Sequence, residues 1–308
     1  MESGSAADSI LDPVTSGDSL ASVTITPVKF GVAIFPTDYA ISMSELAPAA
    51  EQLGFESLWV AEHSHIPANR ETRWPGGGDL PKHYWHTLDP FVALTVAALA
   101  SETLRVATGI CLVIQRDPIH TAKQVASLDR VSNGRFLFGI GAGWNREEMA
   151  DHGTDFGSRM KLMRESVEAM KAIWTQDESE YHGELVNFGR MWCWPKPLQK
   201  PHPPILLGGS GPNVLKRVVS YADAWMPNGR HDLARLPELR DLAQAAGRGP
   251  IPVTYYPKAT AAEIEHLSEA GVERCVYWMP PDGRDEALAK LEELAALIRP
   301  YAEPSSAP

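Results

Sequence analysis

The sequence predicts an α/β fold, a (β/α)8 barrel of the TIM type. Eight apolar, β-rich runs alternate with helical patterns, as is typical of parallel strands that are buried on both faces. The length of 308 residues also suits such a barrel. Strand count alone does not show closure, so a doubly wound sheet stays open as the alternative. The expected strands are residues 28–35, 57–63, 104–114, 135–141, 204–209, 223–229, 252–257 and 274–280.

Three of the expected helices carry clear signals. Residues 118–131 follow Asp117, a good N-cap, with Pro118 at the first helical position and Gly134 just beyond the end. Residues 158–175 place their apolar side chains on one stripe, and residues 284–299 do the same. These stripes indicate helices that pack against the outside of the sheet.

Two segments interrupt the alternation of strands and helices. Residues 64–87 form a long loop after the second strand, and residues 177–203 form an insertion between the fourth helix (158–175) and the fifth strand (204–209), with a short hairpin around His182. Because active sites of such barrels lie at the carboxyl ends of the strands, these segments are candidates for a lid. The loop 64–87 mixes basic and aromatic side chains, which suits a polyanionic ligand tail, an aromatic substrate or a solvated surface.

Composition argues against several classes of function. The net charge of −11 disfavours a nucleic-acid surface, and the longest dense apolar run, residues 91–100, is too short to span a bilayer. The first residues lack the features of a secretory signal, and three widely spaced cysteines suggest reduced thiols. We therefore expect a cytoplasmic protein that acts on a small molecule, with no nucleic-acid or membrane partner. We expect one domain over residues 25–301, with disordered segments at 1–24 and 302–308.

Three glycines at the end of the fourth strand, Gly139, Gly141 and Gly143, invite comparison with a dinucleotide-binding fingerprint. Their spacing is G-x-G-x-G-W, they do not follow the first strand, and an acid-rich stretch that would repel a pyrophosphate comes directly after them. We interpret them instead as positions where a missing side chain lets a flat ring or a neighbouring strand approach closely.

Glu62 and His63 end the second strand, where the catalytic residues of a barrel belong. His63 and His65 also have the spacing that opens a metal site in barrel hydrolases. The fifth and sixth strands end without a histidine, however, so we expect no metal. A structural, hydrogen-bonded His63 is a further interpretation.

A glycine-rich turn, Gly208-Gly209-Ser210, ends the fifth strand and leads into a helix. Free N–H groups at a helix N-terminus favour an anion, and glycine lets the anion approach closely. A tight turn without a ligand is the alternative interpretation. At the end of the third strand, Thr108 offers a hydroxyl and Gly109 a close approach to the backbone.

Four stretches together resemble the bacterial luciferase-like monooxygenase superfamily, and especially its branch that uses the deazaflavin coenzyme F420. They are AEQLGFESLWVAEH, TGICLVIQRDPIHTAKQVASLDRVSNGRFLFGIGAGWNREEM, PKPLQKPHPPILLGGSGP and YADAWMPNG. They occur in the family's order and cover most of residues 28–230. The resemblance implies a luciferase-like (β/α)8 barrel with an insertion between the fourth helix and the fifth strand, and an isoalloxazine-type ring at the C-terminal mouth.

The resemblance also implies roles for single residues. Glu62 and His63 would contact the ring, and His63 would transfer a proton or donate a hydrogen bond. A non-proline cis peptide between Gly109 and Ile110 would back the ring, and the glycine-rich turn would hold the phosphate. The expected cofactor contacts are Thr108, Gly109, Ile110, Ala142, Gly143, Trp144, Asn145, Glu147, Gly208, Gly209 and Ser210.

Two departures from the family pattern narrow the expected function. Luciferases proper carry an arginine for the flavin phosphate where this chain has Ala142, which argues against the luciferase branch. Some deazaflavin dehydrogenases carry a catalytic glutamate where it has Trp144, which disfavours sugar-phosphate dehydrogenase chemistry. We therefore expect an F420-dependent oxidoreductase that moves a hydride between the cofactor C5 and a small organic substrate without oxygen. An FMN-dependent two-component monooxygenase is the alternative, followed by a barrel metallohydrolase and a non-catalytic flavin-binding protein. Dimers are common in the family, so a homodimer stays open.

Overall fold

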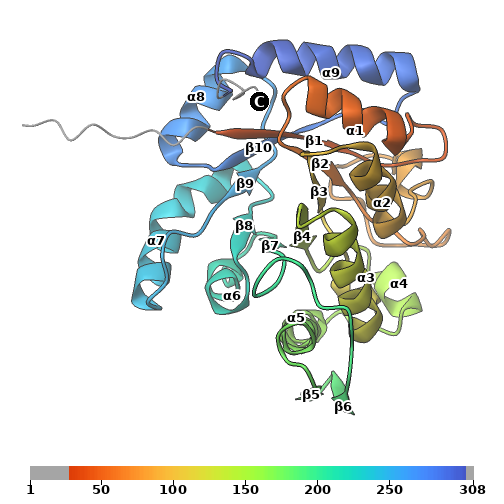
Figure 1. Ribbon diagram of the computed structural model, residues 1–308, viewed down its shortest axis with the longest axis vertical. Helices are drawn as coiled ribbons and strands as arrows, with labels where there is room; N and C mark the ends of the chain where they lie inside the picture. Colours follow the sequence, from red (N-terminus) through yellow and green to blue (C-terminus); the bar gives the residue numbers. More distant parts are fainter. Residues whose placement is uncertain (1–27, 303–308) are drawn as a thin grey trace, which may run out of the picture.

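In the computed structural model, which describes residues 28–302, eight parallel strands form one sheet (Figure 1). They occupy the eight predicted runs, but each strand ends before its apolar run does. Their order in the sheet is β8-β7-β4-β3-β2-β1-β10-β9. The bounds are β1 Lys29–Ile34, β2 Ser57–Val60, β3 Arg105–Thr108, β4 Phe136–Ile140, β7 Ile205–Gly208, β8 Ala224–Met226, β9 Thr254–Tyr255 and β10 Arg274–Trp278.

The two edges of this sheet meet and bring it close to a full barrel. Trp225 of β8 forms a parallel bridge with Val253, just before β9. The backbone N–H of Trp225 donates to the Pro252 carbonyl at 3.0 Å. A doubly wound sheet would keep these edges apart. The predicted TIM barrel is therefore confirmed, and the open-sheet alternative is wrong.

Helices cover the outside of the barrel (Figure 1). The predicted bounds 118–131 are confirmed as α3, where the Asp117 carboxylate accepts a hydrogen bond from the His120 N–H at 2.8 Å. Helix α5 starts one residue later than predicted and α9 ends one residue earlier. The bounds are α1 Met43–Gln52, α2 Pro90–Ala100, α3 Pro118–Val131, α4 Arg146–Asp151, α5 Arg159–Thr175, α6 Val214–Tyr221, α7 Leu236–Ala245, α8 Ala261–Ala270 and α9 Arg284–Ile298, with 3₁₀ turns η1 Lys82–Tyr84, η2 Val113–Gln115 and η3 Arg230–Arg235.

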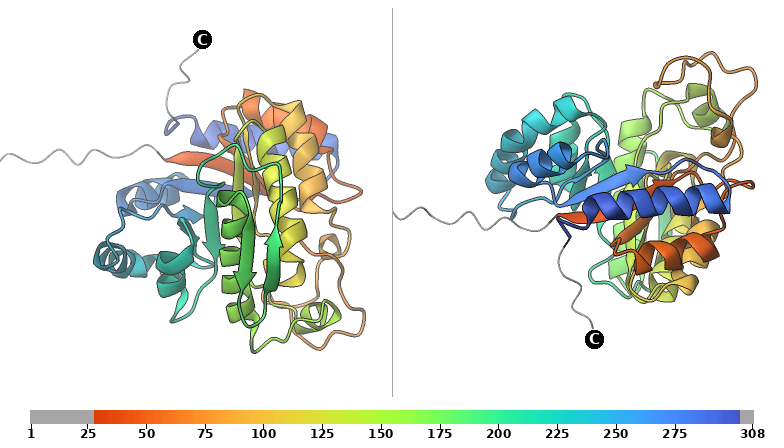
Figure 2. Two further views of the ribbon diagram at one scale, coloured as in Figure 1. Left: turned by 60° about the horizontal axis from the view of Figure 1, so that its bottom comes forward. Right: turned by 90° about the horizontal axis from the view of Figure 1, so that it is seen from above.

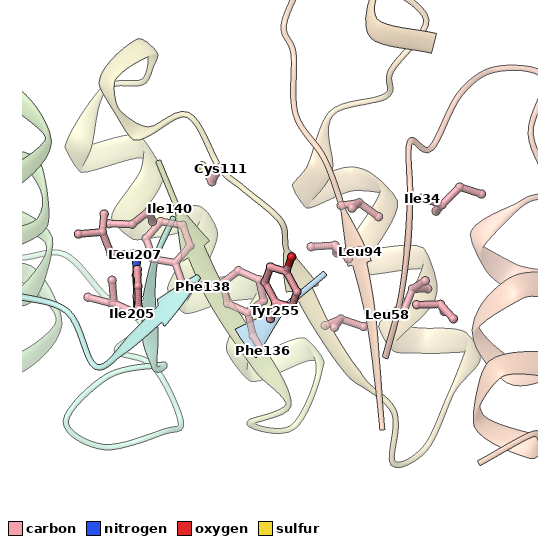
Figure 3. Close-up of a cluster of buried hydrophobic side chains, with 14 of the residues drawn as sticks. Ile34, Leu58, Leu94, Cys111, Phe136, Phe138, Ile140, Ile205, Leu207 and Tyr255 are labelled. Atoms are coloured by element: carbon pink, nitrogen blue, oxygen red, sulfur yellow. The ribbon is translucent and has the colours of Figure 1, made fainter. Parts of the chain in front are cut away.

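The larger part of the core lies between the sheet and these helices. Figure 3 shows Phe136, Phe138 and Ile140 on one face of β4, next to Ile205 and Leu207 of β7, and all five are almost completely buried. Burial of each such side chain contributes about 1.5–3 kcal/mol. This outer layer fixes the strands whose carboxyl ends carry the candidate site.

A second, smaller cluster fills the inside of the barrel. Trp59 is fully buried there, and the strand register places Ala33 and Ala107 on either side of it. One large side chain between two small ones fills the barrel at this level. The other members of the inner cluster are Leu137, Leu206, Ala224, Met226 and Val276. This layer therefore lies beneath the open space at the mouth of the barrel.

The insertion after α5 contains the predicted hairpin. Strands β5 (Ser179–His182) and β6 (Asn187–Met191) pair antiparallel. The segment that follows is tied to α3, because Gln199 donates from its backbone and its side chain to the two carboxylate oxygens of Asp129, at 2.8 and 2.6 Å. The insertion therefore packs along the barrel as a fixed segment.

The ends of the chain bear on two sequence expectations. The expected disordered segment 1–24 and residues 303–308 of the expected tail lie outside the described residues. Ala302, the last described residue, still donates its N–H to the Ile298 carbonyl of α9 at 3.0 Å. Between residues 28 and 302, no helix is long and apolar enough to cross a membrane.

Candidate active site

A cavity of about 730 Å³ opens at the C-terminal mouth of the barrel. Its walls come from residues that end or follow six of the strands, from the loop 64–87 and from α5 and α6, and most of these residues are glycine, apolar or aromatic. Such a cavity has the size and character of a small-molecule site. Eight of the predicted cofactor contacts line it: Gly109, Ile110, Ala142, Gly143, Trp144, Gly208, Gly209 and Ser210.

The residues that follow β3 form one wall of this cavity. They can lie there because glycines on neighbouring β4 leave room for them. The peptide between Gly109 and Ile110 is cis, as the sequence resemblance implied. A Cβ at Gly139 would meet the Thr108 carbonyl, and a Cβ at Gly141 would meet the Ile110 side chain, both closer than the 3.0 Å that real Cβ contacts keep. The glycine run of β4 therefore makes room for the neighbouring strand.

Thr108 itself lies in the barrel wall and does not line the cavity. It is fully buried, and its hydroxyl donates to the Gly139 carbonyl at 2.7 Å. That hydrogen bond joins the ends of β3 and β4. Thr108 thus fixes the position of the Gly109–Ile110 wall from behind.

His63 is held beside the cavity by a partner that the sequence did not reveal. The His63 Nδ1 lies 2.8 Å from the Glu148 Oε2, and both side chains are more than nine-tenths buried. The His63 ring packs against Tyr84 and Trp144, which line the cavity, with ring centroids 5.1 and 5.8 Å away. A carboxylate that is hydrogen-bonded to Nδ1 orients a histidine ring. Glu148 therefore fixes the direction in which the other ring nitrogen of His63, Nε2, points.

Glu62 faces away from the cavity and does not line it. Its Oε2 accepts the Leu112 N–H at 2.6 Å, and its Oε1 accepts from the Arg116 guanidinium, also at 2.6 Å. Arg116 in turn donates to Asp89, the N-cap of α2, at 2.7 Å. The geometry therefore makes Glu62 a brace for the segment after the Gly109–Ile110 wall.

Asn145 and Glu147 lie at the start of α4 rather than in the cavity wall. Asn145 is fully buried and caps the helix by accepting from the Glu148 N–H at 3.3 Å. Glu147 accepts the N–H groups of Glu71 and Thr72 at 3.0 and 3.1 Å, which fastens the loop 64–87 to α4, and both views of Figure 2 place that loop beside α4. Desolvation raises the pKa of Glu147, but hydrogen bonds from the side chain of Thr72 and from backbone N–H groups outweigh it and lower the pKa to about 2.

Two arginines and one carboxylate lie beside the predicted phosphate turn. One of the arginines, Arg235, donates to the Gly211 carbonyl at 2.7 Å and is already paired with Glu238. Arg217 of α6 lines the cavity with Gly208, Gly209 and Ser210. The Ser210 hydroxyl donates to the buried carboxylate of Asp232, and the Gly209 N–H already donates to the Met226 carbonyl at 3.0 Å. An anion at this turn would therefore depend mainly on Arg217 for compensating charge.

Sequence reasoning missed several residues of the site. Tyr256 and Trp278 line the cavity, and their rings stack with centroids 5.4 Å apart. Both residues lie near the carboxyl ends of the predicted strands 252–257 and 274–280, so the strand-end rule that selected His63 could also have selected them. Glu148 had no such signal, because the sequence does not say which acid of α4 faces His63.

The metal interpretation has no geometric support. His65 Nε2 lies 3.0 Å from Asp151 Oδ2, whereas His63 is turned to Glu148. Within residues 28–302 no group of three or more His, Cys, Asp or Glu side chains could hold a metal ion. We therefore do not carry the metallohydrolase alternative further.

A barrel with a ligand-sized cavity at the carboxyl ends of its strands defines a TIM-barrel protein of the enzyme type. The model of the luciferase-like monooxygenase family matches residues 26–304, so the chain belongs to that family. An uncharacterized protein of Mycobacterium tuberculosis is 40% identical over 279 residues, which cover 88% of this chain and 99% of that protein.

Two further relatives differ in the cofactor that their names give. The FMNH2-dependent dimethylsulfone monooxygenase of Pseudomonas putida is 30% identical over 206 residues, which cover 66% of this chain and 52% of that protein. The structure of the coenzyme F420-dependent tetrahydromethanopterin reductase of Methanopyrus kandleri matches with a TM-score of 0.72 at 19% identity, over 90% of this chain and 100% of that one. The comparisons therefore establish the family of this chain, whereas the relatives named here differ in their cofactor.

Proposed function

We propose that the protein is an F420-dependent oxidoreductase acting on a small organic substrate. The observation that carries this proposal is the mouth cavity of about 730 Å³, with Ile110 and Trp144 among its walls and Arg217 beside the glycine turn. Flat, apolar walls suit a tricyclic ring, and the arginine suits a phosphate. When bound, the deazaflavin supplies hydride transfer at C5, and the protein supplies orientation and charge.

His63 lies next to the cavity but is not among the residues that line it, and it is our candidate for the proton partner of this reaction. It lies behind Tyr84 and Trp144 at the edge of the cavity, and Glu148 fixes its ring. We assign His63 to proton transfer or to a hydrogen bond with ring or substrate. Glu148 is assigned as the residue that orients His63, and Glu62 as the brace of the wall.

An FMN-dependent monooxygenase remains the second candidate, because the Pseudomonas putida relative named above is FMNH2-dependent. Ala142, which stands where luciferases carry a phosphate-binding arginine, lines the cavity and offers no charge there. This favours F420 over FMN in our proposal. A non-catalytic flavin-binding protein would share the cavity but show no turnover.

A fluorescence titration with F420 and, separately, with FMN tests the proposal. We expect F420 to be quenched with a micromolar or lower Kd and FMN to bind at least tenfold more weakly. Arg217→Gln should weaken F420 binding by roughly 10-fold or more, the loss of one hydrogen bond to a charged group. Tight FMN binding without F420 binding would reverse the choice of cofactor.

We also propose that the chain forms a homodimer through α2. Three large apolar side chains of this helix are exposed, Val92, Val96 and Leu99, at 63%, 41% and 72% of their surface. Exposed apolar side chains gathered on one helix mark a contact surface. Neighbouring α3 adds Val131, which is 45% exposed.

A further inference from the structure

A groove lies between α5 and α6, which are neighbours in Figure 1, and it shares lining residues with the mouth cavity. Its volume is about 420 Å³, and Met160 and Arg217 line both spaces. A ligand in the mouth cavity could therefore continue past these two residues into the groove.

The groove is basic in a protein that is acidic overall. Four of its eight lining residues are Lys161, Arg164, Lys216 and Arg217, and none is acidic, although the chain has a net charge of −11. Lys161 is paired with Glu184, and Arg164 is paired with Glu168. Lys216 and Arg217 form no ion pair with any residue of the described chain. The groove thus carries uncompensated positive charge.

Two more arginines lie near Arg217. Arg146 and Arg159 both lie over the ring of Phe156, at 4.0 and 3.5 Å from its centroid. Burial, and then the charges of Arg146 and Arg217, lower the pKa of Arg159, so the three cations are close enough to repel one another. Such repulsion is relieved when an anion lies among them.

A buried, unpartnered hydroxyl marks the groove independently of these charges. Tyr221 lines it and is only 4% exposed. Its hydroxyl has no hydrogen-bond partner among the described residues. A buried hydroxyl without a partner is costly, and an anionic oxygen in the groove would supply one.

We propose that this groove binds a chain of carboxylates that continues from the ligand in the mouth cavity. This inference rests on the proposed function, since F420 carries glutamate residues beyond its phosphate whereas FMN ends at its phosphate. In the basic-aromatic loop 64–87, which the sequence suggested for such a tail, two cations are engaged by other residues: Arg70 contacts Thr72 and Trp144, and Lys82 lies over the ring of Tyr39. The tail site is therefore between α5 and α6.

The test compares two forms of F420, one with an oligoglutamate tail and one without glutamate. Kd is measured by fluorescence quenching for the full chain and for the double variant Arg164→Gln/Lys216→Gln, which leaves the mouth cavity intact. We expect the tailed form to bind more tightly to the unmodified protein, and the double variant to lose roughly 2- to 30-fold of that advantage, the range for two exposed ion pairs. Added salt should reduce the advantage in the unmodified protein.

A matched control removes two charges elsewhere. Lys290→Gln/Arg299→Gln changes the charge equally on and after α9, on the opposite side of the molecule from α5 (Figure 1), and should keep the full advantage of the tail. Tyr221→Phe, which removes only the hydroxyl, should weaken the tailed form alone.

The outcomes separate this inference from the proposed function. If both F420 forms bind but the tail gives no advantage, or the double variant keeps it, the groove does not hold the tail and the cofactor assignment stands. If neither form binds, the cofactor assignment fails. Calorimetry with penta-glutamate then decides the groove: binding that the double variant loses supports an anion site, and no binding overturns it.

Discussion

Gly109 offers the sharpest test of how the cavity wall is built. A Cβ added at this position would lie closer to the Tyr256 hydroxyl oxygen than the 3.0 Å limit of real contacts, whereas its next neighbours, Trp59 Cε3 and Tyr256 Cζ, would be at 3.3 and 3.5 Å. The Tyr256 ring cannot easily move aside, because it packs edge-on against Trp59 and stacks on Trp278. Gly109→Ala therefore forces one oxygen, or the wall itself, to move by about 1 Å to reach ordinary contact.

The size of the effect follows from that displacement. Overpacking of this kind costs about 1–3 kcal/mol of unfolding free energy. A wall shifted by about 1 Å should also weaken ligand binding and turnover by up to roughly a hundredfold. Tyr256→Phe removes the one clashing atom, and its hydroxyl has no partner among the described residues, so the single change should cost little.

The double variant Gly109→Ala/Tyr256→Phe should recover most of the lost stability and F420 affinity. Urea unfolding and fluorescence titration of all four proteins give the coupling free energy. Tyr277→Phe in the Gly109→Ala background is the matched control, because Tyr277 also has a buried, unpartnered hydroxyl but does not line the cavity. Equal behaviour of the two double variants, or an undisturbed Gly109→Ala protein, would refute this reasoning.

Three further predictions concern the catalytic pair, the lid and the dimer. His63→Ala should lower kcat roughly 10²–10⁴-fold with little change in F420 Kd, and Glu148→Gln should lower kcat less, as expected for a residue that orients the base. The pKa of Glu147 is lowered from its ordinary 4.5 to about 2, so its hold on the loop 64–87 is complete above pH 4.5 and is lost as the pH falls toward 2, which pepsin cleavage of the loop would report. Leu99→Glu should convert a dimer to a monomer in sedimentation experiments.

Each of these predictions has a clear contrary result. Equal kcat for His63→Ala and the unmodified protein would make that histidine structural. Glu147→Gln should remove the acid dependence of loop cleavage, and an unchanged dependence would assign it to other groups. A monomeric unmodified protein, or a dimeric Leu99→Glu variant, would exclude the α2 contact.

The fold was readable from the sequence because it depends on patterns that repeat locally. Apolar runs identified all eight barrel strands, and Asp117 with Pro118 fixed the start of α3. Helix α4 escaped prediction since six residues are too few for an apolar stripe to show. The barrel was predicted correctly, although the strand count alone does not show closure, which rests on the bridge between Trp225 and Val253.

The site was readable only in part, for a similar reason. Position at a strand end correctly brought His63 near the cavity, but the same rule placed Glu62 there, and its carboxylate is drawn instead to Arg116. The partner of His63 is 85 residues away in sequence, so no local pattern could name Glu148. The basic groove likewise joins α5 and α6, whose arginines and lysines look solvated when either helix is read alone.

A structure of the complex with F420 tests the central claim most directly. We predict density for the ring in the mouth cavity against Ile110 and Trp144, with His63 beside it and the phosphate near Ser210 and Arg217. A ring bound outside this cavity, or a cavity that F420 at saturating concentration leaves empty while FMN fills it, would contradict the account.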